Sequence, residues 1–274
     1  MLKTLESKIS ALNSEFAYRF SRFKHRKNLP ALEKRDRLIL NALKKDGAYV
    51  TTLADLGLKT TPELLQAAHK LLPTMVANSN HQAQQLPQIY TVTDFSEFTA
   101  WGHEQRLLNI IENYLSLPVA FQGVHLRQDF PNQNQFGTLL WHKDSEDRRM
   151  VKIIIYLHDV EEKHGPFEYV PLSSLSNLNS YWIDYKLWKS GYLGINDEEL
   201  KAIIPQSAWK SCPGPAGTVI IADPRTVLHH GTLRTEARPA LFFVYTANPP
   251  KRPELCTQYW DDTFAKPDVA KVAI

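Results

Sequence analysis

Several features that mark whole classes of protein are missing from this sequence. No apolar run approaches the length needed to cross a bilayer, and Leu2, Leu5 and Ile9 near the start are separated by polar and charged residues, unlike the apolar stretch of a signal peptide. A cytoplasmic protein is therefore expected. The two cysteines, Cys212 and Cys256, lie far apart without zinc-binding or redox spacing, so both are predicted to be free thiols.

A strong charge of one sign is missing too. The 274-residue chain has a formal net charge of +3, which is too small to indicate nucleic-acid binding. The positive excess lies in the first 46 residues, where no aromatic-interleaved binding motif accompanies it, and it fits a solvated helix face. We predict no nucleic-acid partner and no membrane partner, and the sequence leaves the oligomeric state open.

The first part of the chain has the apolar spacing of helices. Between residues 2 and 24, apolar side chains recur at steps of three and four, which predicts an amphipathic helix. They are Leu5, Ile9, Leu12, Phe16, Phe20 and Phe23. Further helices are predicted over 32–45, 61–72 and 102–115, with a short strand over 48–53. Because no internal repeat appears, we expect one domain over 1–274 with a mainly helical part over 1–117.

Beyond residue 117 the pattern changes to short runs rich in β-branched and aromatic residues, separated by Gly, Pro, Asn and Asp. The predicted strands cover residues 119–130, 137–142, 151–157, 167–170, 218–222 and 240–247. Several short strands after a helical first third favour a sandwich or barrel that carries helices on one side. We assign this β core to residues 118–250, with a helical, aromatic insertion at about 176–210.

The stretch Trp141-His142-Lys143-Asp144 carries the first candidate site. Successive side chains of a strand point to opposite faces, so His142 and Asp144 would share one face, whereas Trp141 would pack the strand and Lys143 would meet solvent. A third ligand from His229 or His230 would complete the two-histidine, one-carboxylate set that suits non-haem ferrous iron. A His-x-Asp pair alone is a weak signal.

A second segment, residues 229–238, strengthens the case for an iron site. His229 is followed by His230 and Gly231, and Arg238 comes nine residues after His229 at the start of an apolar run. Together with His-x-Asp, this pattern resembles the phytanoyl-CoA dioxygenase family of Fe(II)/2-oxoglutarate oxygenases. Three further stretches carry the resemblance, which covers roughly residues 120–247. They are Ile155-Tyr-Leu-His-Asp-Val160, Gly165-Pro166 and Gly217-Thr-Val-Ile220.

The resemblance implies a double-stranded β-helix, or cupin-like jelly roll, with the N-terminal helices packed outside it. It implies that His142, Asp144 and His229 hold Fe(II) and that Arg238 anchors 2-oxoglutarate, with O2 as co-substrate. His229 is preferred to His230 because it has the family's His-x-Gly context and the nine-residue spacing to Arg238.

The implied activity is oxidation of a small molecule with release of succinate and CO2. Because Asp144 is present, hydroxylation, desaturation or oxidative demethylation or cleavage is favoured over halogenation, which in related enzymes needs a small residue there. One departure from the family concerns substrate contacts: Pro171-Leu-Ser-Ser174 replaces its Pro-Gly-Ser-His. The substrate could be an amino acid, a natural-product scaffold or an acyl thioester.

Weaker candidates flank these motifs. Arg127 shares a strand face with His125 and Asp129 and would contact 2-oxoglutarate or substrate, unless that face is merely solvated. Thr232 is a candidate for a hydrogen bond to the cofactor. Candidate substrate contacts are Arg148, Arg149 and Trp182, the last within an aromatic insertion that would either act as a lid or serve only in packing.

Two other functions stay open. The chain would be a catalytically silent jelly-roll binding protein if the cup bound only a ligand or partner, but the intact ligand set argues against this. It would be a cupin-type metal enzyme without 2-oxoglutarate if no group anchored the 2-oxo acid, and Arg238 argues against that.

Overall fold

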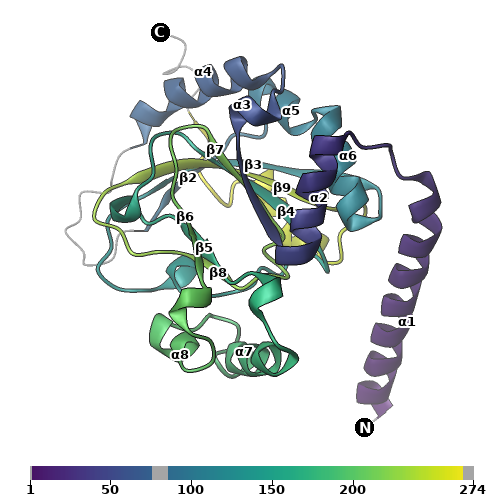
Figure 1. Ribbon diagram of the computed structural model, residues 1–274. Coiled ribbons are helices and arrows are strands. Elements are labelled where there is room, and N and C mark those ends of the chain that lie inside the picture. The colour runs from purple at the N-terminus through teal and green to yellow at the C-terminus, as the bar shows by residue number, and fades with distance from the viewer. Residues whose placement is uncertain (1, 76–85, 268–274) are drawn as a thin grey trace.

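The computed structural model describes residues 2–75 and 86–267, with side chains from residue 12 onward (Figure 1). The helices are α1 (Leu2–His25), α2 (Lys34–Asp46), α3 (Leu53–Leu56), α4 (Thr61–Leu71), α5 (Ser96–Gly102), α6 (Gln105–Leu115), α7 (Asn177–Lys189) and α8 (Asp197–Lys201). The strands are β1 (Ala48–Thr52), β2 (Gln88–Thr91), β3 (Val119–Asp129), β4 (Met150–Tyr156), β5 (Phe167–Tyr169), β6 (Lys210–Cys212), β7 (Thr218–Ala222), β8 (His229–Gly231) and β9 (Arg238–Ala247).

The strands form two antiparallel sheets, with orders β1-β7-β4-β9-β3-β2 and β6-β5-β8. Apolar side chains of β4, β7 and β9 pack against Phe167 and Tyr169 of β5, so the two sheets enclose a common interior. This arrangement is a jelly roll with flanking helices, and the predicted fold class is confirmed. No described helix combines the length and the apolarity that crossing a membrane requires.

Strand alternation decides which side chains reach that interior. On β4, Val151, Ile153 and Ile155 belong to the core under the helices, whereas Ile154 and Tyr156 face the smaller sheet. Lys152 lies on the same face as Ile154, so an otherwise apolar strand carries an ammonium group into the barrel. The even-numbered residues of β9 face inward by the same rule.

The helices α2, α4, α5 and α6 cover the outer face of the larger sheet (Figure 1). Leu43, Leu64 and Ile111 are buried there, and the Trp101 ring centroid lies 4.5 Å from that of Phe243 on β9. The resulting core makes the larger sheet a rigid wall from which the interior side chains project.

The predicted strand over 137–142 is wrong. Gly137 has a positive φ of 52°, which starts a single 3-10 turn, Gly137–Leu139, instead of an extended segment. Trp141 and His142 then pair one residue at a time, with Ile195 and His229 respectively. Each bridge reaches a different segment, which is why no continuous strand forms.

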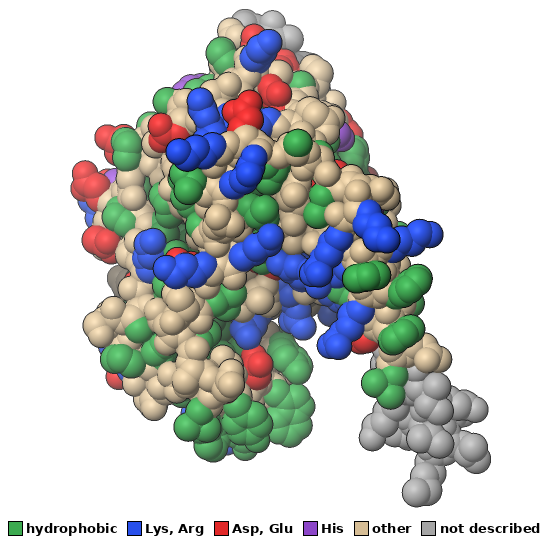
Figure 2. Space-filling model, turned by 45° about the vertical axis from the view of Figure 1, so that its right-hand side comes forward, with side chains coloured by type: hydrophobic (Ala, Val, Ile, Leu, Met, Phe, Trp, Pro, Cys, Tyr) green, Lys and Arg blue, Asp and Glu red, His purple; other side chains and the backbone are tan. Residues whose placement is uncertain are grey.

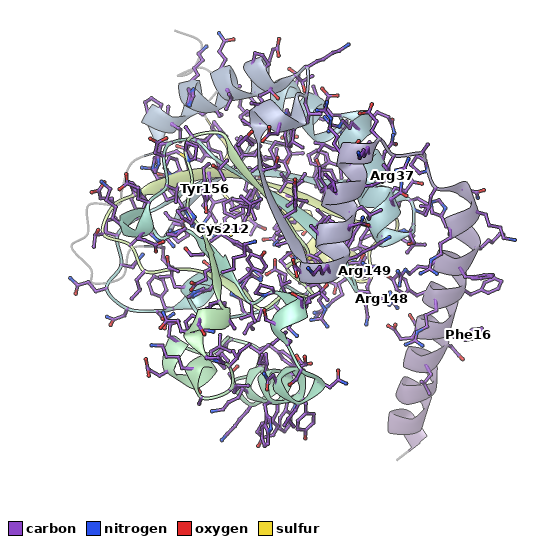
Figure 3. The ribbon with its side chains drawn as sticks, viewed as in Figure 1. Phe16, Arg37, Arg148, Arg149, Tyr156 and Cys212 are labelled. Atoms are coloured by element: carbon purple, nitrogen blue, oxygen red, sulfur yellow. The ribbon has the colours of Figure 1, made fainter. Side chains whose placement is uncertain are left out.

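The helix α1 was correctly predicted as helical, but its apolar stripe faces solvent. Leu12, Phe16, Phe20 and Phe23 are 59–73% exposed, and Figures 2 and 3 show apolar side chains along the outer side of α1, with Phe16 pointing away from the body. The opposite, polar face attaches the helix: Arg22 Nε donates to the Leu115 carbonyl at 3.1 Å. Side chains of the first residues, Leu5 and Ile9 among them, lie outside the described part.

This orientation gives a prediction about stability. Phe20→Ala is expected to change the free energy of unfolding by less than about 0.5 kcal/mol, because its side chain is already exposed. Phe243→Ala, which empties a fully buried position, is expected to cost about 3–5 kcal/mol. Urea titration of both variants measures the difference, and equal losses would show that the stripe is buried in solution.

Candidate metal and cofactor site

A reciprocal backbone bridge places two histidines side by side. The amide of His142 donates to the carbonyl of His229 at 3.0 Å, and the amide of His229 donates back at 3.1 Å. Residues that exchange both hydrogen bonds lie directly opposite each other in an antiparallel pair, so their side chains leave on the same face. The two ring centroids are 4.4 Å apart.

Asp144 completes the group. Its Oδ1 lies 3.6 Å from His142 Nε2 and 3.9 Å from His229 Nε2, and one ligand atom from each of the three residues lies within 4.8 Å of the others. The amide of Asp144 donates to the Pro224 carbonyl at 2.9 Å, which fixes the segment after the bridge. The structure thus brings together the three residues that the sequence suggested as metal ligands.

Both imidazoles are prepared to coordinate through Nε2. Nδ1 of His142 lies 2.7 Å from the Leu140 carbonyl and Nδ1 of His229 lies 3.2 Å from the Val227 carbonyl. A carbonyl only accepts, so each Nδ1 carries the proton and each Nε2 keeps a free lone pair. Burial lowers the pKa of His142, and it lowers the pKa of His229 to about 3, so both rings are neutral at neutral pH.

A lysine in the wall of the cavity holds the carboxylate. Lys152 Nζ lies 2.7 Å from Asp144 Oδ2 and 3.0 Å from Glu146 Oε1, and Tyr259 donates its hydroxyl to the same Glu146 oxygen. Burial alone would raise the pKa of Asp144, but the Lys152 ammonium beside it outweighs that effect and holds the pKa of that carboxyl well below its usual range. Asp144 is therefore ionised, with Oδ2 engaged and Oδ1 turned toward the histidines.

Beside these ligands lies a cavity of about 100 Å³. Arg238, Arg127 and Thr138 supply polar groups to its wall, and Ile154 and Phe242 supply apolar surface. Two histidines and one carboxylate suit a divalent iron with open positions, and Arg238 suits a carboxylate on an organic cofactor. The residues present fit both groups.

Arg238 is fixed by a carboxylate across the sheet. Asp129 lies opposite it in the β3–β9 register, and Arg238 Nη2 donates to Asp129 Oδ2 at 2.9 Å. Arg127 and Arg234 contact the same carboxylate at 2.7 and 2.9 Å. We call Arg127, Arg234 and Arg238 around Asp129 the arginine cluster. Gly231 leaves room for it, since a Cβ there would lie 2.9 Å from Arg234 Nη2.

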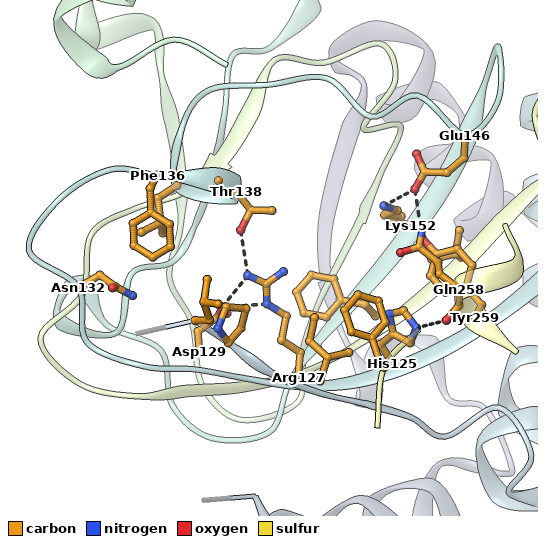
Figure 4. Close-up of a pocket in the computed structure, with 18 of the residues that line it drawn as sticks. His125, Arg127, Asp129, Asn132, Phe136, Thr138, Glu146, Lys152, Gln258 and Tyr259 are labelled. Atoms are coloured by element: carbon orange, nitrogen blue, oxygen red, sulfur yellow. Dashed lines mark hydrogen bonds and ion pairs between the residues drawn. The ribbon is translucent and has the colours of Figure 1, made fainter. Parts of the chain in front are cut away.

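A wider cavity of about 360 Å³ adjoins the first (Figure 4). The two share Arg127, Thr138, Lys152 and Phe242 in their walls. The face that carries His125, Arg127 and Asp129 points into this wider cavity instead of toward solvent. Burial lowers the pKa of His125 to about 4, so its ring is neutral.

His230 points away from the ligand group. Its Nε2 lies 3.0 Å from Glu168 Oε2, its Nδ1 lies 2.9 Å from the Leu139 carbonyl, and its ring stacks on Trp141 at 3.8 Å. Trp141 is buried, as expected. Lys143, which was expected in solvent, is instead paired with Asp184 of α7 at 2.8 Å.

Three further candidates lie outside both cavities. Thr232 donates its backbone amide to the Pro166 carbonyl at 3.1 Å and lines neither cavity. Arg148 pairs with Glu15 of α1 at 2.7 Å, and Arg149 stacks over Tyr114 with its guanidinium carbon 4.1 Å from the ring centre. Figure 3 shows these two arginines between the body and α1.

The aromatic insertion does not cover the ligands. Trp182 is 46% exposed on α7 and contacts Tyr181 and Tyr185, and no α7 residue lines either cavity. Ile183 and Leu187 of α7 instead pack with Trp141 in a separate apolar cluster. In the described structure the insertion therefore packs behind the His-x-Asp segment, which favours the packing alternative over a lid.

Sequence reasoning missed Lys152, Glu146 and Arg234. One feature of the sequence could have identified Lys152. It is a lone cation within the apolar run from Met150 to Tyr156, and a charge buried with such a run needs a partner. Glu146 and Arg234 lie in polar loops where nothing in the sequence distinguishes them from solvated residues.

Comparison with known proteins identifies a family whose members resemble this chain. The model of the phytanoyl-CoA dioxygenase family matches residues 63–239. No curated protein matches the chain at a significant level.

Solved structures share the fold at low identity. The non-heme alpha ketoglutarate dependent epimerase SnoN from nogalamycin biosynthesis has 16% identity and a TM-score of 0.53, covering 78% of this chain and 83% of its own. Iron-bound EctD from S. alaskensis has 19% identity and a TM-score of 0.53, with coverage of 81% and 79%. HygX from Streptomyces hygroscopicus, with nickel and 2-oxoglutarate bound, has 16% identity and a TM-score of 0.51, with coverage of 79% and 88%.

The hold of Lys152 on Asp144 can be tested with two matched pairs of substitutions. The charge-balanced double variant Lys152→Met/Glu146→Gln is expected to weaken zinc binding about 10- to 100-fold, because partners that orient a ligand contribute on that scale. Lys143→Met/Asp184→Asn removes an equal ion pair from the other face and is expected to leave the affinity unchanged. Competition with a chromophoric chelator measures both, and equal losses in the two pairs would show that Lys152 does not orient the ligand.

Proposed function

This chain belongs to the phytanoyl-CoA dioxygenase family of Fe(II)/2-oxoglutarate oxygenases, and we propose that it oxidises a small molecule at His142, Asp144 and His229. The observation that carries the proposal is the convergence of these three residues on one point beside a buried arginine. EctD has been solved with 2-oxoglutarate and 5-hydroxyectoine, and this supports a small-molecule substrate here.

In this proposal the three ligands hold Fe(II) through His142 Nε2, His229 Nε2 and Asp144 Oδ1. Both Nδ1 protons are held by backbone carbonyls, so the rings cannot rotate without losing a hydrogen bond. Lys152 occupies the other oxygen of Asp144, which favours coordination through a single oxygen. Iron held by these three residues would have room left for a 2-oxo acid and for O2.

We assign the distal carboxylate of 2-oxoglutarate to Arg238. A guanidinium presents paired N–H donors that match a carboxylate, and Arg238 Nε is buried without a hydrogen-bond partner among the described residues. Asp129 and the Gly165 carbonyl hold its other nitrogens, so the side chain is positioned before the cofactor arrives. Ile154 and Phe242 would exclude water from the cofactor.

When bound, iron and 2-oxoglutarate would supply the oxidising chemistry, in which O2 is consumed, succinate and CO2 are released and the substrate is oxidised. The chain's contribution is to position the reactants and to keep the site dry. The presence of Asp144 favours hydroxylation, desaturation or oxidative demethylation or cleavage over halogenation.

The ligand assignment gives a direct test. Anaerobic addition of Fe(II) and 2-oxoglutarate to the wild-type protein is expected to produce a weak visible charge-transfer band. His229→Ala is expected to abolish the band, because it removes a ligand, whereas His230→Ala is expected to keep it, because His230 faces Glu168. The reverse result would exchange the two histidines, and absence of a band in the wild-type protein would contradict the oxygenase function.

A second test concerns the anchor. Arg238→Lys keeps the charge beside Asp129 but loses the paired donors, and we expect it to weaken 2-oxoglutarate binding about 10- to 100-fold, the scale of one or two charged hydrogen bonds. Titration of 2-oxoglutarate against the same band measures the change. Arg35→Lys, at an exposed position, is the control. Equal affinity in all three proteins would show that another group anchors the cofactor.

A further inference from the structure

The wider cavity is placed where a substrate would reach the metal. It shares a wall with the metal cavity, and Lys152, which touches Asp144, lines both. Its volume of about 360 Å³ lies in the range of small-molecule pockets. Apolar side chains form much of its lining. They are Ile89, Phe136, Phe242, Val244 and Phe264.

Polar groups gather at two ends of this cavity. Figure 4 shows Arg127, Asp129 and Thr138 at one end, and Lys152 and Glu146 at the other. At the second end Lys152 is the one cation and lies between the carboxylates of Asp144 and Glu146, so positive charge is not in excess there. At the first end positive charge is in excess.

The arginine cluster has three cations around one carboxylate. Burial would raise the pKa of Asp129, but the three guanidinium groups outweigh it and hold that pKa well below the usual range. Burial lowers the pKa of Arg234 to about 10, which still leaves it protonated at neutral pH. Two positive charges are therefore uncompensated in a buried site, where an unpaired charge is costly.

The proposed cofactor neutralises only one of the two uncompensated positive charges. The distal carboxylate of 2-oxoglutarate, assigned above to Arg238, contributes one negative charge to the cluster. Its other carboxylate would lie at the metal. The charges around the metal cancel one another. The two positive charges of Fe(II) are offset by Asp144 and by the second carboxylate of the cofactor, and Lys152 is offset by Glu146. The remaining positive charge of the arginine cluster therefore stays unpaired.

An unused donor marks where that charge lies. Arg234 is 3% exposed, and its Nε makes no hydrogen bond with the described residues. Buried donors in folded proteins are nearly always paired, so the free state of this Nε indicates a missing acceptor. Arg127 lines the same cavity, and its Nη2 donates to Thr138 at 2.9 Å (Figure 4).

We infer that the wider cavity binds a substrate with an apolar body and one anionic group, and that Arg127 and Arg234 hold the anionic group. This inference rests on the proposed function. A carboxylate or a phosphate has the acceptor geometry that guanidinium groups match. The apolar body lies along Phe242 and Phe136, which directs its far part toward Lys152 and the metal. A cationic substrate would add to the unpaired charge and is excluded.

The test uses three probes with nearly the same skeleton and different charge: phenylacetate, phenylacetamide and phenethylamine. The protein is loaded with zinc, which is redox-inert, and with 2-oxoglutarate, and dissociation constants are measured by ligand-observed NMR. Equivalent trios built on indole-3-acetate and on hexanoate vary the apolar body. At least one anion is expected to bind about tenfold or more tightly than its amide and amine, the scale of a charge-assisted hydrogen bond.

Variants locate the effect. Arg234→Gln and Arg127→Gln are each expected to abolish the preference for the anion while 2-oxoglutarate still binds, and Arg35→Gln, at an exposed position, is expected to keep it. If Arg234→Gln does not fold, as judged by circular dichroism, Arg127→Gln decides, because its side chain is 16% exposed.

Two results overturn the inference: no anion in the three trios binds more tightly than its amide, or the preference survives both substitutions. Failure of the proposed function looks different. In that case zinc and 2-oxoglutarate do not bind the wild-type protein, and the probes are then measured without them, which tests the arginine site by itself.

Discussion

The reciprocal hydrogen bonds between the backbones of His142 and His229 are the contact on which the site depends. These two residues come from segments that share no strand, and one bridge sets their side chains on the same face. Asp144 follows two residues later and is fixed by its own amide bond to Pro224. The metal-ligand geometry is therefore specified by backbone hydrogen bonds, which any change of side chain leaves largely in place.

Buttressing from behind keeps this bridge in position. Trp141 pairs with Ile195, stacks on His230 and donates its indole N–H to Asp197 at 2.8 Å. Lys143 reaches Asp184. The residues that alternate with the ligands thus bind the insertion that contains α7 and α8, so the same segment has a chemical face and a structural face. Rigid support of this kind is what holds ligands within the tolerance that catalysis needs.

The alternation of side chains between the two faces of a strand explains why much of the site was predictable. The placement of His125, Arg127 and Asp129 on one face of β3 follows from strand geometry. The anchor role of Arg238 was implied by the family resemblance, of which the spacing from His229 is one part. The orientation of α1 was not predictable in this way. Its apolar stripe is evident, but the polar face of the helix found Leu115 and Arg148, residues more than ninety positions away, and no local pattern encodes such a choice.

The side-chain directions of the loop arginines were not predictable for a related reason. Arg148 and Arg149 directly follow the His-x-Asp segment, yet proximity in sequence does not fix the direction of a side chain. Arg148 lies 2.7 Å from Glu15 and Arg149 lies 3.9 Å from Asp223, and neither arginine lines the two cavities.

The cations that do reach the interior come from the strands β3, β4 and β9 and from Arg234, which forms an isolated bridge with Asn132 before β9. A jelly roll that places Lys152, Arg127, Arg234 and Arg238 inside gives up some stability, since buried ion pairs contribute little or cost free energy compared with apolar packing. Such an interior is sensible only if something binds there. Its surplus of positive charge then selects what enters, because an anion removes the electrostatic cost and a cation increases it. The same charges that weaken the fold can therefore provide its specificity.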